Sequence, residues 1–162
     1  MFENYKIKRI QLLPMSDRED DNGFEDENEV RDFLDRELAE NDGIYGYNKR
    51  GIDLEDTDAL ILFQFRNNIV GYGVYQTRNR EEKYYKFYAD TIYNTEKITA
   101  DELGKIIPKF THFSRVKQII DMQYIDEILL LLQKKKNTFY RNRNTDNKTE
   151  RRKNTKPFAS KI

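Results

Sequence analysis

Three tyrosines have the residue type and the setting to stack on a flat aromatic ligand. Tyr45 and Tyr47 lie in the glycine-flanked stretch GIYGYNKRG (43–51), and Tyr75 lies near the end of the apolar stretch 59–76. A nucleobase that leaves its stack is held between aromatic walls and by hydrogen bonds to its edge. Each such ring contributes about 1–3 kcal/mol per base. The tyrosines therefore predict an aromatic-walled pocket, with ordinary core packing as the alternative for each ring.

Two glycines in the same region could form the floor of that pocket. The stretch ALILFQFRNNIVGYGVYQ (59–76) predicts two strands joined at Asn67-Asn68, since asparagine tolerates the positive φ angles of a type I′ turn. A glycine inside a strand marks a bend or a place where something approaches the backbone closely. Curvature of the sheet and a ligand-binding trough are both consistent with this pattern. In the predicted register Gly71 and Gly73 leave this trough on the face that they share with Leu62 and Gln64.

Polar side chains beside these elements could hold a phosphate or the edge of a base. The stretch THFSRVK (111–117) combines a histidine, a hydroxyl and two cations. Arginine binds phosphate or guanine through two parallel hydrogen bonds. His112, the one histidine of the chain, is expected to be packed or solvent-facing rather than catalytic. The expected polar contacts are Asn48, Lys49, Ser114, Arg115 and Lys117.

Charge is distributed unevenly along the chain, although its 29 basic and 29 acidic residues cancel. Residues 1–50 carry 8 basic and 14 acidic side chains, residues 51–133 carry 10 and 13, and residues 134–162 carry 11 and 2. A basic segment binds phosphates by releasing their counterions. The alternative is a solvated tail that only aids solubility. The expected phosphate contacts of this tail are Lys134, Lys135, Lys136, Arg141, Arg143, Arg151, Arg152 and Lys153.

The residue patterns of common enzyme and metal sites are missing. There is no cysteine, which excludes disulfides, thiolate nucleophiles and cysteine-based zinc sites. Glu81-Glu82-Lys83 has the E-x-K spacing of some metal-dependent nucleases, but a charged turn between strands produces such a triplet by chance. The acidic stretch 17–29 lacks the glycine and glutamate spacing of a calcium loop. We therefore expect no enzyme activity, no cofactor and no metal site.

Apolar periodicity predicts a small α+β domain with a curved, largely antiparallel sheet. From residue 137 onward this periodicity is lost, so 137–162 is predicted to be disordered in isolation. The predicted organisation is one domain over 1–136 followed by the basic tail. Strands are expected at 5–13, within 59–76 and at 84–93, and helices at 24–40, 100–107 and 124–136.

In the order and spacing of these segments the chain resembles PUA-like domains, most closely the EVE-type modules that accompany HNH endonucleases in restriction systems. The resemblance rests on LILFQF (60–65), IVGYG (69–73), YYKFYADTIY (84–93) and FSRVKQIID (113–121), and it extends over residues 24–132. It implies a barrel-like sheet flanked by helices, which binds nucleic acid and in some members holds one modified base. The chain departs from the pattern because no nuclease domain is present in the sequence.

The expected function is that of a nucleic-acid-binding module linked to restriction or to a mobile element. The expected partner is DNA rather than RNA, and a separate nuclease acting in trans is left open. The alternatives are an inhibitor-type protein-interaction module of a phage or mobile element and a small-molecule or nucleotide sensor. The longest apolar run is too short to span a bilayer, so a cytoplasmic protein without a membrane partner is expected.

Overall fold

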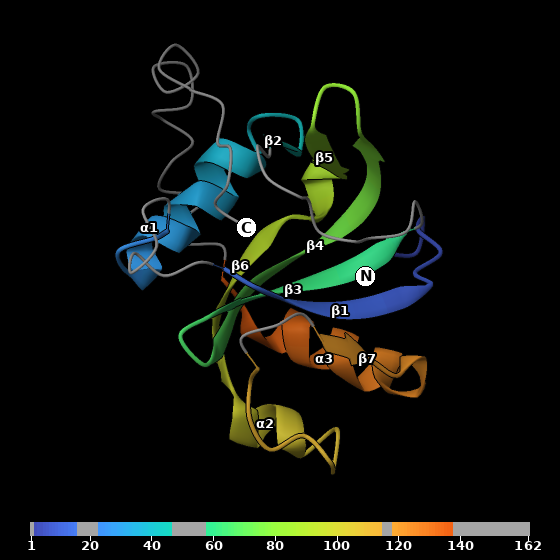
Figure 1. Cartoon of the computed structure of the whole chain (residues 1–162). Helices are drawn as coiled ribbons and strands as arrows, with labels where there is room; N and C mark the ends of the chain where they lie inside the picture. The colour runs from blue at the N-terminus through green and yellow to red at the C-terminus, as the bar shows by residue number, and fades with distance from the viewer. Residues whose placement is uncertain (1, 16–22, 47–57, 115–117, 138–162) are drawn as a thin grey trace.

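The computed structural model describes residues 2–15, 23–46, 58–114 and 118–137, and all of its elements lie within those ranges (Figure 1). Within these ranges, strands and short helices alternate, and no helix is long. The elements in chain order are β1 (Arg9–Pro14), α1 (Glu27–Asp32), the π-helix η1 (Phe33–Leu38), β2 (Ile44–Gly46), β3 (Ala59–Phe65), β4 (Asn68–Asn79), β5 (Tyr84–Phe87), the 3₁₀ turn η2 (Ala89–Thr91), β6 (Tyr93–Thr99), α2 (Ala100–Gly104), β7 (Gln118–Ile120), the 3₁₀ turn η3 (Met122–Tyr124), α3 (Ile125–Lys135) and β8 (Lys136–Asn137).

In the described part of the chain, eight strands form one curved sheet that is not closed into a barrel (Figure 1). The main path runs β2-β5-β4-β3-β1-β7, and β6 pairs with both β4 and β8. The pair β1–β3 is parallel, and the other pairs are antiparallel. β4 is the longest strand, and along one edge it pairs first with β6 and then with β5. The predicted α+β class with a curved, mostly antiparallel sheet flanked by helices is confirmed.

Helices cover both faces of the sheet, so every residue of β3 is buried. One face packs against α1 and η1 through Val30, Phe33 and Leu34. The other face packs against α2 and α3 through Leu103 and Ile128. Figure 1 shows α1 on one side of the sheet and α2 and α3 on the opposite side. Strands that are buried on both faces lose the alternation of polar and apolar residues. This explains why the sequence of β3 is almost continuously apolar.

The turn of the β3–β4 hairpin lies one residue earlier than predicted. Arg66 and Asn67 have φ angles of 47° and 65°, and Phe65 pairs with Asn68. Positive φ at both link residues is the geometry of a type I′ turn. The turn type was therefore predicted correctly, but its placement at Asn67-Asn68 is wrong. A second irregularity between Phe63 and Gln64 changes which side chains of β4 share a face with those of β3.

Other element boundaries also differ from the sequence predictions. The first strand begins at Arg9 rather than at residue 5, and residues 2–8 lie outside the sheet. The strand β6 was not predicted, because its sequence YNTEKIT is mostly polar. The predicted helix over 24–40 is divided between α1 and η1. β8 includes Asn137, one residue beyond the predicted end of the domain.

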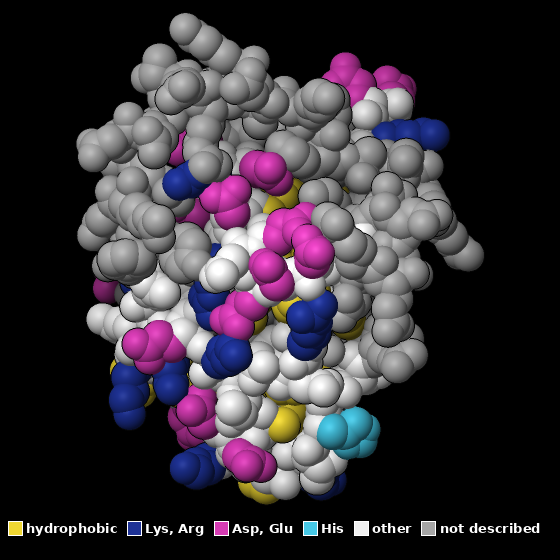
Figure 2. Space-filling view, turned by 90° about the vertical axis from the view of Figure 1, so that its left-hand side faces the viewer, with side chains coloured by type: hydrophobic (Ala, Val, Ile, Leu, Met, Phe, Trp, Pro, Cys, Tyr) yellow, Lys and Arg dark blue, Asp and Glu magenta, His cyan; other side chains and the backbone are white. Residues whose placement is uncertain are grey.

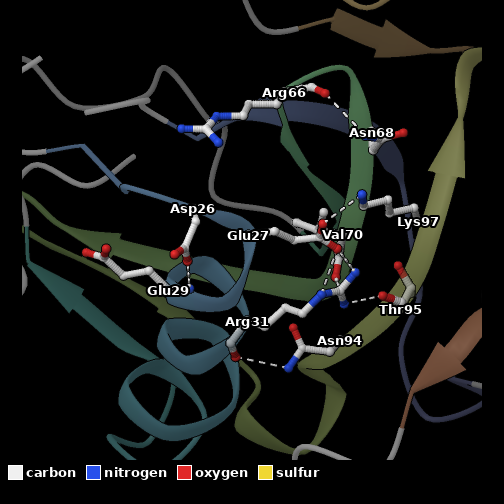
Figure 3. A network of polar contacts seen from close by, with 10 residues as sticks. All are labelled: Asp26, Glu27, Glu29, Arg31, Arg66, Asn68, Val70, Asn94, Thr95 and Lys97. Atoms are coloured by element: carbon white, nitrogen blue, oxygen red, sulfur yellow. Dashed lines mark hydrogen bonds and ion pairs between the residues drawn. The ribbon is translucent and has the colours of Figure 1, made fainter. Parts of the chain in front are cut away.

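A buried arginine joins α1 to an irregularity between β4 and β6 (Figure 3). The register shifts there, since Ile69 pairs with Ile98 but Gly71 pairs with Asn94. Arg31 is 5% exposed, and its guanidinium donates to the backbone carbonyls of Val70 (3.3 Å) and Thr95. These carbonyls lie where the sheet ladder is interrupted. The arginine therefore supplies hydrogen bonds that the strands do not, as buried carbonyls require.

The same guanidinium forms an ion pair with Glu27, one turn earlier on α1. Its Nε lies 2.9 Å from a carboxylate oxygen of Glu27, and Lys97 lies 3.2 Å from the other oxygen. The backbone carbonyl of Arg31 in turn accepts from the Asn94 side chain at 3.0 Å. Both ends of the arginine thus contact the β4–β6 region, which fixes α1 on this face of the sheet (Figure 3).

Glu27 gives this network a predicted pH dependence. Burial alone raises the pKa of its carboxyl, but hydrogen bonds and charges from Arg31 and Lys97 hold the pKa below the ordinary value of 4.5. A lowered folded-state pKa stabilises the fold above the unfolded-state pKa, and that stability is lost as pH falls through the folded value. We expect the stability advantage of the wild type over Glu27→Gln to shrink below about pH 4.5.

Urea unfolding of the two proteins at a series of pH values measures this difference. Glu82→Gln, at an exposed position between β4 and β5, is the control for the loss of one carboxylate. A Glu27→Gln difference that is constant over the acidic range would show that the Arg31 contact does not depend on the charge of Glu27.

Candidate nucleic-acid interface

The two described tyrosines of the predicted pocket are buried in the core. Tyr45 in β2 is 1% exposed and Tyr75 in β4 is 0% exposed. The Tyr45 ring meets Phe33 edge-on at 5.2 Å, and Tyr75 packs against Tyr85 and Phe87 at 6.3 and 5.8 Å. Both rings therefore have the core role that the sequence left open as the alternative. Neither forms the wall of an open pocket in this conformation.

The trough predicted over the two glycines is also filled by protein. A Cβ at Gly71 would lie 2.5 Å from Leu34 Cδ1 and 2.8 Å from the Tyr93 carbonyl oxygen. A Cβ at Gly73 would lie 3.1 Å from Ile92 Cγ1. The predicted trough is wrong, because η1, Ile92 and the start of β6 approach the backbone of β4 there. The glycines accommodate this close approach of the protein's own chain, whereas the sequence analysis expected curvature or a ligand-binding trough.

Gly71→Ala is expected to lower the free energy of unfolding by about 2–3 kcal/mol, because the added methyl group overlaps Leu34 and a backbone carbonyl. Gly46→Ala is the matched control, since nothing lies within 4 Å of the position of its Cβ. Chemical unfolding of both variants measures the difference. Equal stabilities of the two variants would contradict the close packing described for Gly71.

Gln64 lies on the opposite face from the glycines and fixes a loop. Its Nε2 donates to the Ser114 carbonyl at 2.8 Å, and the Ser114 amide donates to the Gln118 side chain at 3.2 Å. Gln64 is 6% exposed, so it holds the loop from within the fold. The predicted grouping of Gln64 with Gly71 and Gly73 is therefore wrong. Ser114 is positioned at the start of the segment that leads to β7.

The histidine of the same loop lies at the surface. His112 is exposed, and its Nδ1 lies 3.0 Å from the hydroxyl of Thr111. The described residues contain no cluster of three or more side chains able to hold a metal ion.

Several predicted binding residues lie outside the residues that the structure describes, so they stay predictions. They are Tyr47, Asn48, Lys49, Arg115, Lys117, Arg141, Arg143, Arg151, Arg152 and Lys153.

The three lysines at the beginning of the basic tail have different environments. Lys134 is exposed at the end of α3. Lys135 forms an ion pair with Glu102 of α2 at 3.1 Å. Lys136 begins β8, and its Nζ lies 3.7 Å from the centre of the Tyr93 ring in a cation–π contact. β8 pairs with β6, so the basic tail leaves the domain from a fixed position beside β6.

A row of five aromatic rings near this position was not predicted as a site. Phe2 meets Tyr72 edge-on at 5.8 Å, and Tyr72 lies 5.9 Å from Tyr93. Tyr5 lies 4.4 Å from Tyr88 and 6.5 Å from Phe2. The row therefore runs in the order Tyr88, Tyr5, Phe2, Tyr72 and Tyr93. The spacing of these residues in the sequence gives no signal that would bring them together.

Two carboxylates accept hydrogen bonds from the hydroxyls of this row. The Tyr5 hydroxyl lies 2.9 Å from both carboxylate oxygens of Asp90, and the Tyr88 hydroxyl donates to Asp58 at 3.0 Å. Burial, followed by the contact with Asp90, raises the pKa of Tyr5. Burial and the contact with Asp58 raise the pKa of Tyr88 in the same way. Both hydroxyls are thus held in their protonated, donating form.

The face that carries α1 is not uniformly basic in its described part. Figure 2 shows acidic side chains across the middle of this face, with Lys and Arg side chains beside and below them. Glu25 and Asp26, at the start of α1, are among the exposed acids. A continuous polyanion would meet repulsion here, so the described part of this face does not favour phosphate binding.

No family model matches the chain, and no curated protein matches it. A similar solved structure is the YTH domain of the Zygosaccharomyces rouxii MRB1 protein in complex with N6-methyladenosine RNA. The likeness has a TM-score of 0.44 and 13% sequence identity, and it covers 76% of this chain and 85% of that chain. A likeness at this level carries no statement about function. No helix in the described residues is long and apolar enough to cross a membrane.

Proposed function

We propose that this chain is a nucleic-acid-binding module of PUA-like organisation, in which the basic tail makes the main phosphate contacts. The observation that carries the proposal is the separation of charge. Residues 134–162 carry 11 basic and 2 acidic side chains, whereas residues 1–133 carry 18 and 27. Phosphates are attracted to residues 134–162 and repelled by residues 1–133. The segment order described for PUA-like, EVE-type domains supports the same class of function.

The domain holds the start of the tail in place. The ion pair of Lys135 with Glu102 and the stacking of Lys136 on Tyr93 attach the start of the tail to α2 and β6. The antiparallel pair β6–β8 adds backbone hydrogen bonds. A nucleic acid bound by the tail is therefore kept close to one part of the body, which raises its effective concentration there.

Selection of a base is the finer part of the proposal. Its candidates are Tyr47, Asn48 and Lys49 together with Arg115 and Lys117. DNA is the expected partner. The contacts of Ser114 with Gln64 and Gln118 support this assignment, because they hold the residue immediately before Arg115. An arginine side chain can form two hydrogen bonds to a guanine or a phosphate.

Fluorescence polarisation of the full chain with labelled nucleic acids tests the proposal. The probes are duplex DNA, single-stranded DNA and single-stranded RNA of one sequence and length, with cytosine and adenine either plain or methylated. We expect all three classes to bind at low salt and a methylated DNA duplex to bind more tightly than the plain one. No binding to any probe at low salt would contradict the proposed function. Equal binding of plain and methylated probes would contradict the proposed base selection but not the binding of nucleic acid by the tail.

The acidic body favours one second candidate, a protein-interaction module that engages a basic partner. The excess of acidic side chains in residues 1–133 and the acids across the face in Figure 2 support it. Such a module would compete with nucleic acid for a basic protein. The same polarisation experiment separates the two functions, because this candidate predicts no direct binding of nucleic acid by the chain.

A further inference from the structure

Residues 2–8 form a strap that lies against the sheet without belonging to it. Within the described residues, its one backbone hydrogen bond to the body runs from the Lys8 amide to the Asp58 carbonyl at 2.8 Å. The Tyr5 amide bonds only within the strap, to the Phe2 carbonyl at 3.0 Å. The strap is therefore held mainly by side chains. Segments with few backbone hydrogen bonds to the body open at low free-energy cost.

Three side chains of the strap, those of Phe2, Tyr5 and Ile7, pack against the core, and the two aromatic ones lie among three rings of the body. Phe2 lies against Tyr72, and Tyr5 lies against Tyr88. Tyr72 is 0% exposed, while Tyr88 and Tyr93 are half-buried. Because Phe2 covers Tyr72, lifting the strap uncovers an aromatic surface formed by Tyr72, Tyr88 and Tyr93.

The groups around this surface fit a nucleobase. Asp58 and Asp90 accept hydrogen bonds from Tyr88 and Tyr5 in the closed arrangement. A base with an amino group can donate to Asp90 once Tyr5 has left, as cytosine donates to a carboxylate. The occupants of the surface are flat, uncharged rings, so a flat aromatic ligand can take their place. Stacking of a base on an aromatic ring is favourable and tolerates different sequences.

The basic tail begins at the end of this surface. Lys136 stacks on Tyr93, and Lys134 is exposed just before it. A strand whose phosphates are bound by the tail is therefore led to the rings of Tyr93 and Tyr72. This continuity favours a single-stranded nucleic acid over other aromatic ligands.

We propose that the strap covers a base-stacking surface of Tyr72, Tyr88 and Tyr93, and that single-stranded nucleic acid displaces Phe2 and Tyr5 from it. This inference rests on the proposed function, because the tail supplies the phosphate contacts. A site covered in most molecules has an apparent affinity reduced by the fraction that is open. The strap is thus an autoinhibitory contact for base binding.

The test compares full-length variants in polarisation assays with labelled single strands of about twelve deoxycytidines or deoxythymidines, a size within the range that one small domain covers. Phe2→Ala/Tyr5→Ala removes both rings of the strap and should bind the cytidine probe about tenfold more tightly than the wild type. Asn4→Ala, at an exposed strap position, is the control and should leave affinity unchanged. Adding Tyr93→Ala to the double variant should abolish the gain.

Tyr5→Phe keeps the ring but removes the hydrogen bond to Asp90, so it loosens the strap without exposing the core. It should raise affinity about twofold. If the double variant does not fold, this variant tests whether loosening the strap raises affinity. If the wild type binds and neither strap variant binds more tightly, the inference is overturned and the proposed function still stands. A gain that survives Tyr93→Ala also overturns it. Absence of binding by every variant contradicts the proposed function itself.

Discussion

Replacing Arg31 with methionine is expected to lower the free energy of unfolding by about 3 kcal/mol. The substitution leaves the carbonyls of Val70 and Thr95 without this donor in the gap between β4 and β6. It also leaves the Glu27 carboxylate, which is partly buried, with Lys97 as its remaining cation in the network. Removing one partner of a buried charge pair is costly because the other charge stays desolvated. Urea unfolding followed by circular dichroism measures the change.

Lys97→Met is the matched control at the outer end of the same network. Its side chain is 58% exposed, so its loss should cost less than about 1 kcal/mol. Combining Arg31→Met with Glu27→Gln should cost less than the sum of the single changes, because the second change removes the unpaired carboxylate. If Arg31→Met and Lys97→Met have equal effects, Arg31 does not anchor α1 as described.

Neutralising the tail is expected to weaken binding to nucleic acid by about 100-fold at low salt. The variant replaces five tail cations by glutamine in the full chain, so the domain itself is unchanged. Each lost cation removes one phosphate contact and the counterion release that accompanies it. Polarisation with a labelled DNA duplex measures the affinity. The five positions are Arg141, Arg143, Arg151, Arg152 and Lys153.

A control variant with the same change in net charge distinguishes the loss of tail contacts from a general effect of net charge on binding. It replaces five exposed cations of the domain by glutamine, which should weaken binding by less than about tenfold. Equal losses in the two variants would mean that net charge, and not the tail, determines binding. The control positions are Lys6, Lys8, Arg80, Lys105 and Lys109.

Sequence patterns predicted the elements whose periodicity is strong. The amphipathic pattern of 124–136 gave α3 within one residue at each end. The hairpin over 59–76 was found as two strands with a type I′ turn. Its register was missed because β3 is buried on both faces, so neither face is marked by polar residues. The irregularity at Phe63 and Gln64 has no signature in residue type.

The candidate site could be predicted only in part. Aromatic residues beside glycines suggested a pocket, but Tyr45 and Tyr75 fill the core, and Leu34 lies where the ligand was expected. Composition cannot distinguish a ring that packs inside from a ring that lines a pocket. The row from Tyr88 to Tyr93 depends on contacts of residues 2–8 with β4 and with Tyr88, which lies between β5 and η2. Such long-range contacts leave no local pattern in a single sequence.

The dependence of nucleic-acid affinity on salt tests the central claim most directly. The full chain is titrated with one labelled DNA duplex at a series of salt concentrations, and log Kd is plotted against log salt concentration. Binding through about five phosphates predicts a slope near 4.5, since each phosphate contact on duplex DNA contributes about 0.9. A slope near zero, or no binding at the lowest salt, would contradict the claim that the basic tail holds nucleic acid by its phosphates.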